Sequence, residues 1–239
     1  MIVAIDAGNS RIKWAVHERS GWRDRGVLAT ADVAWLADAA DEWPAVARVV
    51  VCNVAGKAVA ESISSLLGQR YGRIVFLHPS AEACGVRNGY EHSWQLGADR
   101  WAALIGARSV SAAACLVVCA GTATTVDLLD ATGLFRGGLI LPGFDLMRES
   151  LARQTAQLPF AEGAFRDEPR NTEDAIFSGC LQAQLGAVER LFATLAGEPD
   201  ARCLLTGGAA GHLAAHLQIP FERIDDLILK GLVRYADTL

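Results

Sequence analysis

The chain has 239 residues, a formal net charge of −5, and a composition that is 51% hydrophobic and 21% charged. Such a composition is typical of an ordered globular protein and excludes an intrinsically disordered one. The acidic balance argues against a general nucleic-acid binder, which needs a basic face, but it leaves small anionic ligands open, because backbone amides and one lysine can hold a phosphate.

The first 110 residues alternate between short apolar runs and amphipathic stretches, a pattern that predicts one α/β half. Apolar or alternating runs predict strands at residues 2–5, 12–17, 48–53 and 73–77. Apolar residues at helical spacing predict helices at residues 30–43, 57–70 and 96–110. Thr30 is the expected cap of the first of these helices.

The same pattern begins again after residue 110. Strands are expected at residues 116–119, 124–129, 134–141 and 202–205. Helices are expected at residues 147–157, 172–196 and 221–236, and a loop at residues 159–170. The repetition predicts two similar α/β halves, residues 1–110 and 111–239, with a nucleotide in the cleft between them and with the last helix able to pack back on the first half.

The turn between the first two expected strands has a composition that suits phosphate binding. Gly8 lets the backbone approach a phosphate because it has no β-carbon. The turn amides and the side chains of Asn9, Ser10 and Lys13 can donate to phosphate oxygens. Asp6, at the end of a buried strand, is placed to hold Mg²⁺ through water. An ordinary hairpin would explain the same residues by turn preference alone.

The second half opens with a similar turn. Gly121 and Thr122 lie between its first two expected strands, and Thr124 and Thr125 follow. Small residues and clustered hydroxyls suit a clamp on the β- and γ-phosphates, although threonine is also a good strand former. The presence of one such turn in each half favours phosphate binding.

A carboxylate near the start of the helix expected at residues 96–110 could serve phosphoryl transfer. Moving a γ-phosphoryl group to an alcohol requires that the alcohol is oriented and that its proton is accepted. Asp99 could do both, Gly97 allows close substrate approach, and Arg100 can bind an anionic or polar group. The same residues could instead form a helix cap, with Asp99 complementing the helix dipole, and the two interpretations are compatible.

Five motifs in this order resemble the type III pantothenate kinases, which belong to the actin-like ATPase superfamily. The motifs are found at residues 6–13, 96–100, 121–123, 137–143 and 171–176. Each motif is weak alone, but the ordered set extends over nearly the whole chain. The resemblance implies two ribonuclease H-like halves with mixed sheets flanked by helices. It also implies a cytoplasmic enzyme that phosphorylates pantothenate with ATP to 4'-phosphopantothenate, the first step of coenzyme A biosynthesis.

The resemblance further implies roles for individual residues. Asp99 is the proton acceptor, and Asp6 holds Mg²⁺ through water. The residues implied in nucleotide binding are Asp6, Gly8, Asn9, Ser10, Lys13, Gly121, Thr122 and, in an adenosine-binding turn, Gly207 and Gly208. The residues implied in pantothenate binding are Tyr90, Gly97, Ala98, Asp99, Arg100 and Thr172.

Three of these residues also have ordinary structural explanations. Tyr90 could be a half-buried loop tyrosine, and a glycine-rich turn such as that at Gly207 is common after a strand. Thr172 opens a helix, and on local grounds we expect it to be the N-cap. In the family this threonine contacts the pantothenate of the neighbouring subunit, which implies a homodimer that is required for activity.

The chain departs from the family at Cys119. Type III pantothenate kinases usually have an aspartate there, which helps to hold a monovalent cation, K⁺ or NH₄⁺. A neutral thiol is a poor ligand for either cation. The cation is therefore dispensable, or it is held by carbonyls and another carboxylate such as Asp127, or turnover is impaired; we favour the second of these three outcomes.

The six cysteines include no CxxC pair, so neither a zinc ribbon nor a redox motif is expected, and the thiols are expected to be buried and reduced. No apolar stretch approaches the length of a membrane span, and no signal peptide is expected.

Two other functions remain open. The chain could be a regulatory relative that binds nucleotide with little turnover, a hypothesis that Cys119 favours and that the intact Asp6, Lys13, Asp99 and Arg100 oppose. It could also be a kinase of the same fold for another alcohol, although most sugar kinases of the superfamily are considerably longer.

Overall fold

The structure is a computed structural model that describes residues 1–19, 21–43, 48–71, 74–158, 160 and 162–239. The chain divides into two compact units, which we describe one at a time. The first unit contains Met1–Ala112, Gly133–Phe135 and Asp226–Leu239. The second unit contains Ala113–Thr132 and Arg136–Asp225. The closing segment of the chain is thus counted with the first unit.

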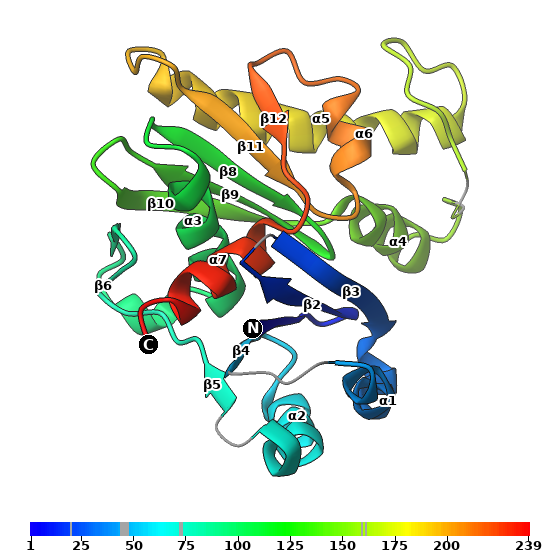
Figure 1. Cartoon of the computed structure of the whole chain (residues 1–239). Helices are drawn as coiled ribbons and strands as arrows, with labels where there is room; N and C mark the ends of the chain where they lie inside the picture. The colour runs from blue at the N-terminus through cyan, green and yellow to red at the C-terminus, as the bar shows by residue number, and fades with distance from the viewer. Residues whose placement is uncertain (20, 44–47, 72–73, 159, 161) are drawn as a thin grey trace. The chain divides into compact units, whose positions relative to one another are not determined.

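The first unit is built on a mixed five-stranded sheet (Figure 1). Its strands are β1 (Ile2–Ala7), β2 (Arg11–Glu18), β3 (Gly21–Ala29), β4 (Arg48–Asn53) and β5 (Ile74–Phe76). Their order in the sheet is β3-β2-β1-β4-β5. The pairs β1–β2 and β2–β3 are antiparallel, whereas β4 is parallel to both β1 and β5. The central strand β1 therefore has partners on both sides and ends at the turn that carries Gly8.

Helices cover both faces of this sheet. They are the 3-10 helix η1 (Thr30–Trp35) and the α-helices α1 (Leu36–Asp41), α2 (Lys57–Tyr71), α3 (Ala98–Val110) and α7 (Leu227–Ala236). Val3 and Ile5 of β1 share a core with Leu36 of α1 and Ile63 of α2. Because side chains alternate along a strand, Asp6 lies on the opposite face, where α7 packs on β1 and β4.

Helices α3 and α7 lie side by side and meet backbone to backbone (Figure 1). A β-carbon on Gly231 of α7 would lie 1.9 Å from the carbonyl oxygen of Ala102 in α3. A β-carbon on Gly106 of α3 would lie 2.2 Å from the carbonyl oxygen of Leu227. Glycine is therefore required at both positions, because any larger residue would push the two helices apart.

A short hairpin follows in the first unit, between the sheet and α3. It consists of β6 (Glu82–Ala83) and β7 (Val86–Asn88), and the 3-10 helix η2 (Ser93–Gln95) lies between β7 and α3. Leu134 and Phe135, also in the first unit, pair in parallel with Arg87 and Asn88 of β7. A segment that lies 47 residues further along the chain thus pairs with the strand that leads into the loop before α3.

The second unit is also built on a mixed sheet. Its strands are β8 (Cys115–Ala120), β9 (Ala123–Leu129), β10 (Leu134–Pro142, from its third residue on), β11 (Arg202–Thr206) and β12 (Phe221–Arg223), in the order β12-β11-β8-β9-β10. Its helices are α4 (Phe144–Gln154), α5 (Thr172–Phe192), the 3-10 helix η3 (Ala193–Leu195) and α6 (Ala210–Ala214). Strands β8 and β9 form an antiparallel hairpin, and β11 is parallel to β8. Alternate residues of these strands, including Leu116, Val118 and Val126, pack with α5.

Most predicted elements are confirmed, but the closing segment is not. Residues 221–236 were expected to form one helix, whereas Phe221–Arg223 forms strand β12, parallel to β11. Helix α7 begins only after Asp226, which has the left-handed backbone angles φ 59° and ψ 30°. The apolar periodicity of α7 does not extend to Phe221–Arg223, and a short edge strand has little pattern of its own that would distinguish it from the helix that follows.

The expected cap at Thr30 is also wrong, and β3 was not predicted. The segment from Thr30 begins as a 3-10 helix that Ala29 precedes without a side-chain cap. Thr30 instead donates its hydroxyl to the carbonyl oxygen of Gly8, at 2.7 Å. Strand β3 escaped prediction because it is largely exposed, so it lacks the apolar alternation of a half-buried strand. The expected strand at 73–77 is present as β5, although residue 73 lies outside the described residues.

The six cysteines all lie within the described residues, and each is a thiol rather than half of a disulfide. Cys84 and Cys119 are partly exposed and the other four are buried. Within the same residues, no cluster of three or more histidine, cysteine, aspartate or glutamate side chains could hold a metal ion, and no helix is long and apolar enough to cross a membrane.

Candidate active site

The turn between β1 and β2 is closed by its own backbone. The amide of Gly8 donates to the carbonyl oxygen of Arg11 at 3.0 Å, so this amide closes the turn instead of facing a ligand. Thr30 holds the other side of the turn, because its amide donates to the carbonyl oxygen of Ser10 at 3.1 Å. The side chains of Asn9 and Ser10 are exposed at the tip. The turn is thus rigid and presents polar side chains outward.

Asp6 and Lys13 form a cross-strand pair directly behind this turn. Burial raises the pKa of Asp6 to about 7, which Lys13 partly offsets and the charge of Asp99 reinforces. A carboxylate within the electrostatic reach of another carboxylate is a favourable place for a cation. The first unit therefore brings together the strand that carries Asp6 and the start of the helix that carries Asp99.

Helix α3 begins in the manner that the sequence predicted. Gly97 is its N-cap with extended backbone angles, and Asp99 lies in the first turn. One carboxylate oxygen of Asp99 accepts a hydrogen bond from the amide of Arg100 at 2.8 Å. The fully buried Trp101 holds the start of the helix in the core, and its amide donates to the carbonyl oxygen of Gly97 at 2.9 Å. The carboxylate of Asp99 is thus fixed by the helix while remaining partly exposed.

Arg100 is almost completely buried, with 3% of its surface exposed, although a charged side chain is rarely buried without partners. Its guanidinium donates to the hydroxyl of Tyr90 at 2.8 Å. The same guanidinium lies over two aromatic rings, with its central carbon 5.5 Å from the ring centre of Tyr90 and 5.6 Å from that of Phe135. The motifs did not point to Phe135, because only the fold brings it to Arg100.

The turn between β8 and β9 in the second unit is closed in a similar way. The amide of Gly121 donates to the carbonyl oxygen of Ala123 at 3.0 Å. The carbonyl oxygen of Thr122 accepts a hydrogen bond from the amide of Gly143, which begins α4, at 2.9 Å. Gly121 and Thr122 are both exposed.

A buried glutamine supports this turn. Gln184 of α5 is fully buried and accepts a hydrogen bond from the hydroxyl of Thr124 at 2.9 Å. Its amide nitrogen donates to the carbonyl oxygen of Pro142 at 3.0 Å. Both polar atoms of the Gln184 side chain thus have hydrogen-bond partners inside the core. Helix α5 thereby holds Thr124, which follows the turn, and Pro142, which precedes α4.

The glycine-rich turn after β11 lies against the same hairpin. Strand β11 runs parallel to β8, and its Thr206 is the register partner of Cys119. The amide of Ala209 donates to the carbonyl oxygen of Ala120 at 3.1 Å. Gly207, with φ +106°, and the exposed Gly208 therefore lie beside the turn that carries Gly121.

Cys119 shares one face of the β8–β9 hairpin with a carboxylate. Cys119 pairs with Thr125, and Val117 pairs with Asp127. Paired residues of an antiparallel ladder point to the same face, and so do residues two apart along a strand. Asp127 therefore faces the same side as Cys119. Asp127 is fully buried, and the hydroxyl of Thr125 is buried with no hydrogen-bond partner among the described residues.

The start of helix α5 corrects the expected cap at Thr172. The N-cap is Asn171, whose side-chain oxygen accepts a hydrogen bond from the amide of Asp174 at 2.8 Å. The carboxylate of Asp174 in turn accepts from the side-chain amide of Asn171 at 3.0 Å. Thr172 is the first helical residue and is exposed. Asparagine and threonine both favour the N-cap, so the local sequence did not separate them.

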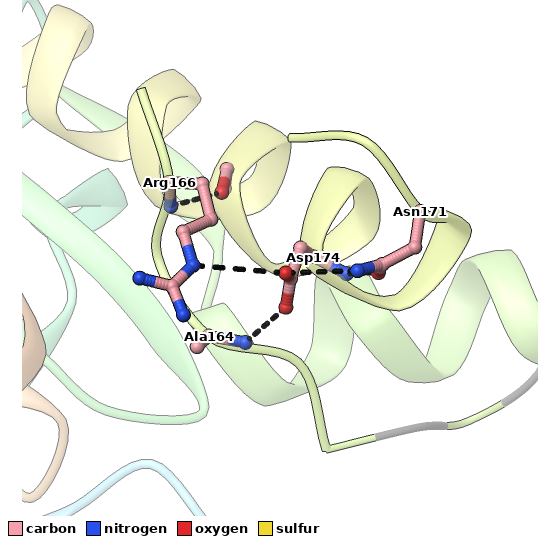
Figure 2. A network of polar contacts seen from close by, with 5 residues as sticks. Ala164, Arg166, Asn171 and Asp174 are labelled. Carbon is pink, nitrogen blue, oxygen red and sulfur yellow. Dashed lines mark hydrogen bonds and ion pairs between the residues drawn. The ribbon is translucent and has the colours of Figure 1, made fainter. Parts of the chain in front are cut away.

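Figure 2 shows that the carboxylate of Asp174 also holds the preceding loop. It accepts a hydrogen bond from the amide of Ala164 at 2.8 Å and lies 3.8 Å from Nε of Arg166. The hydrogen bond from Ala164 and that from Asn171 lower the pKa of Asp174. The loop before α5 is thus fastened to its first turn, beside Thr172.

The structure gathers the predicted site residues into two groups. The first unit brings together Asp6, Gly8, Asn9, Ser10, Lys13, Tyr90, Gly97, Ala98, Asp99 and Arg100. The second unit brings together Cys119, Gly121, Thr122, Gly207 and Gly208. Thr172 stands at the exposed start of α5, and no described contact joins it to the glycine turns.

Comparison with known proteins identifies a family. The profile of the family described as "Type III pantothenate kinase" matches residues 2–194. A type III pantothenate kinase from Aromatoleum aromaticum is 57% identical over 236 residues, which cover 99% of this chain and 98% of the relative. A relative from Dechloromonas aromatica with the same description is 47% identical, with 99% of each chain covered.

A solved structure shows the same fold at low sequence identity. A protein from Campylobacter jejuni, assigned to the Baf family of transcriptional activators, is 19% identical, covers 99% of this chain and 98% of its own, and has a TM-score of 0.67. The solved structures that share this fold include two proteins described as kinases, from Sinorhizobium meliloti and Listeria monocytogenes, at 14% and 13% identity and with TM-scores of 0.59 and 0.60, and the fold is that of the actin-like ATPases. The fold class predicted from the sequence, α/β with mixed sheets flanked by helices, is confirmed.

The corrected cap gives a test with a matched control. Replacing Asn171 by alanine should lower the free energy of unfolding by about 0.5–2 kcal/mol, because one amide of the first turn of α5 loses its acceptor. Thr172→Ala should change it by less than about 0.5 kcal/mol, because Thr172 accepts no capping bond in the structure. Urea unfolding of the two variants measures both values. An equal loss in both variants would restore Thr172 as the cap.

The raised pKa of Asp6 predicts how stability changes with pH. An unfolded aspartate titrates near pH 4, whereas folded Asp6 titrates at about 7. Between these values the folded state binds the extra proton, so the charged form destabilises the fold increasingly as pH rises. Asp6→Asn should therefore match the wild type below pH 4 and become more stable by on the order of 2–4 kcal/mol above pH 7. Urea unfolding across about pH 3–8 with a metal chelator present measures the difference in stability; a difference that does not change with pH would contradict the prediction.

Proposed function

The chain belongs to the type III pantothenate kinase family and phosphorylates pantothenate in coenzyme A biosynthesis, and we propose that Asp99 accepts the proton of the substrate hydroxyl in this reaction. The single observation that carries this proposal is the placement of Asp99, which lies partly exposed in the first turn of α3 with its carboxylate held by the amide of Arg100, where its charge also acts on Asp6. A proton acceptor must lie close to the groups that hold the nucleotide phosphates. The product is 4'-phosphopantothenate.

The reaction forms one bond and breaks one. The hydroxyl oxygen of pantothenate bonds to the γ-phosphorus of ATP, and the bond from that phosphorus to the β–γ bridging oxygen breaks. The bridging oxygen leaves with ADP, and the hydroxyl proton passes to Asp99. The first turn of α3 holds Asp99 in place for this transfer. The reaction consumes ATP, so we place it in the cytoplasm.

Asp6 is the proposed site of Mg²⁺, which would neutralise charge on the phosphate oxygens. Hard oxygen ligands suit this ion, and it keeps most of its waters, so one carboxylate is enough to bind it through water. Burial is the main cause of the raised pKa of Asp6 and the charge of Asp99 adds to it, so a bound cation would stabilise the charged form of both carboxylates. Lys13, opposite Asp6, supplies a second positive charge for the phosphates.

The two glycine turns are the proposed phosphate clamps. Both are closed by the amide of their first glycine, and both present polar side chains at an exposed tip. The residues proposed to hold ATP are Gly8, Asn9, Ser10 and Lys13 on one turn, Gly121 and Thr122 on the other, and Gly207 and Gly208 beside the adenosine.

Pantothenate is the proposed ligand of the group around Arg100. Tyr90 and Arg100 are joined by a hydrogen bond, and Gly97 and Ala98 precede the proton acceptor at the start of α3. A buried guanidinium with an aromatic partner keeps a fixed orientation, which suits recognition of an anionic group.

Thr172 is proposed to complete the pantothenate site of a neighbouring subunit. It is exposed at a helix start that Asn171 and Asp174 hold in place. The same unit exposes the apolar side chains Leu139, Ile140 and Leu146, which a second copy of the chain could cover. An active monomer in light scattering would contradict this homodimer.

A variant at Asp99 tests the proton acceptor. Asp99→Asn should keep the fold, because asparagine can still accept from the amide of Arg100, and should lower turnover by about 10²–10⁴. Coupled detection of ADP with pantothenate and several sugars measures the rate and the acceptor alcohol. Asp38→Asn, on the exposed side of α1, is the control and should keep wild-type turnover. Turnover near that of the wild type in folded Asp99→Asn would overturn the assignment.

The monovalent cation is the part of the proposed function that experiment could most readily overturn, because Cys119 replaces the family's aspartate. We propose that backbone carbonyls and Asp127, on the same face as Cys119, hold K⁺ or NH₄⁺. The rate should then rise with K⁺, and Cys119→Asp should lower the K⁺ concentration for half-maximal rate because it adds a carboxylate. Cys119→Ser, which adds no charge, is the matched control and should not lower it. The measurement is rate against K⁺ at constant ionic strength.

Two results would contradict the proposed cation site or the proposed kinase activity. A flat K⁺ response in the wild type would remove the cation from the proposal. The absence of kinase activity in the wild type and in Cys119→Asp alike would favour the alternative, a regulatory protein that binds nucleotide with little turnover.

A further inference from the structure

Phe135 stands out because it is fully buried in the first unit and none of the predicted motifs includes it. We infer that Phe135 is a positioning residue for pantothenate, acting through Tyr90 and Arg100. The inference rests on the proposed function, in which those two residues bind the substrate.

The first step of the argument is the contact of three side chains. The rings of Tyr90 and Phe135 have their centres 5.1 Å apart and are tilted by 50°. The guanidinium of Arg100 lies over both rings, at 5.5 and 5.6 Å, and donates to the hydroxyl of Tyr90. Each of the three side chains contacts the other two. The position of Phe135 therefore limits the orientations of Tyr90 and Arg100, the two residues proposed to bind pantothenate.

The second step concerns the strength of this contact. Arg100 has 3% of its surface exposed and Phe135 has none. A cation over an aromatic ring is held more strongly when water is excluded, because the attraction is then less screened. Phe135 therefore provides a rigid surface under the guanidinium, whereas Tyr90 is partly exposed and is available to a ligand.

The third step is the backbone that carries the trio. Phe135 pairs in parallel with Asn88 of β7. A β-carbon on Gly89 would lie 2.1 Å from the carbonyl oxygen of Phe135, so the backbone before Tyr90 lies directly against that strand and requires glycine. The loop is also braced from within, because the side chain of Asn88 accepts from the amide of Tyr90 at 3.0 Å and donates to the carbonyl oxygen of Ser93 at 3.2 Å.

These contacts link Phe135 to both residues that are proposed to bind pantothenate, Tyr90 and Arg100. The strand at Phe135 fixes the backbone of the loop that carries Tyr90, and its ring fixes the side chain of Arg100. Loss of the ring should leave the nucleotide groups at Asp6 and Lys13 intact, because none of the described contacts joins them to Phe135. The expected effect is thus selective for pantothenate.

The experiment compares steady-state kinetics of variants of the full chain. Phe135→Leu, which removes the ring, should lower kcat/KM for pantothenate about five- to thirtyfold, mainly through KM. The KM for ATP should stay within about twofold, the scatter expected for a site with no shared contact. Phe135→Tyr, which keeps the ring, should restore pantothenate kcat/KM to within about threefold of the wild type.

Three further variants make the result decisive. Ile63→Val trims the core beneath α2 and should leave both KM values unchanged, which controls for general loss of packing. Phe135→Met keeps the volume without a ring and replaces Phe135→Leu if that variant does not fold, with the same expectation. Arg100→Lys tests the proposed site itself and should raise the KM for pantothenate.

The outcomes separate the inference from the function on which it rests. An unchanged pantothenate KM in the ring-free variant, an equal loss for ATP and pantothenate, or the same loss in Ile63→Val would overturn the positioning role. An unchanged pantothenate KM in Arg100→Lys would overturn the proposed substrate site. A raised KM in Arg100→Lys together with a selective loss in the ring-free variant supports both.

Discussion

The packing of α3 against α7 is the constraint on which the proposed chemistry depends. The two helices meet so closely that Gly106 and Gly231 leave no room for a side chain. Helix α7 packs in turn on β1 and β4. Helix α7 therefore lies against both α3 and the sheet, and it helps to set the position of α3, and so of Asp99, relative to Asp6 in β1. A helix α3 that was free to slide would lose that position, and with it the alignment that the proposed proton transfer requires.

The electrostatics of the first unit follow from that placement. Asp6 points to the same face of the sheet as Ala4, the face on which α7 packs, so its carboxylate is buried and its pKa is raised. A buried carboxylate that bound no cation would only destabilise the fold. In the proposed site, Asp6, Asp99 and Lys13 would hold Mg²⁺ and the nucleotide phosphates, so the stability that the buried charge costs the free protein would be offset when these ligands bind.

Local features were predictable and tertiary ones were not. The turn at Gly8, the strands around it and the start of α3 depend on residues close together in sequence, and the structure has them as expected. Thr30 looked like a cap because threonine favours that position, but the fold uses its hydroxyl to hold Gly8. Phe135 carried no signal at all, since an apolar residue in a strand looks the same whether it fills the core or orients an arginine.

The strand register gives the substitution at Cys119 a physical context. Sheet geometry places residues two apart on one face, so a charge removed at one position can be supplied at a neighbouring one without changing the fold. Asp127 is such a position, two pairs further along the β8–β9 ladder and on the same face as Cys119, and it is fully buried. Beside it, the hydroxyl of Thr125 is buried without a hydrogen-bond partner among the described residues, although buried polar atoms are normally satisfied. A bound cation would provide what that oxygen lacks. The face next to Cys119 thus keeps a carboxylate and an unsatisfied oxygen, and this favours a shifted cation site over a lost one.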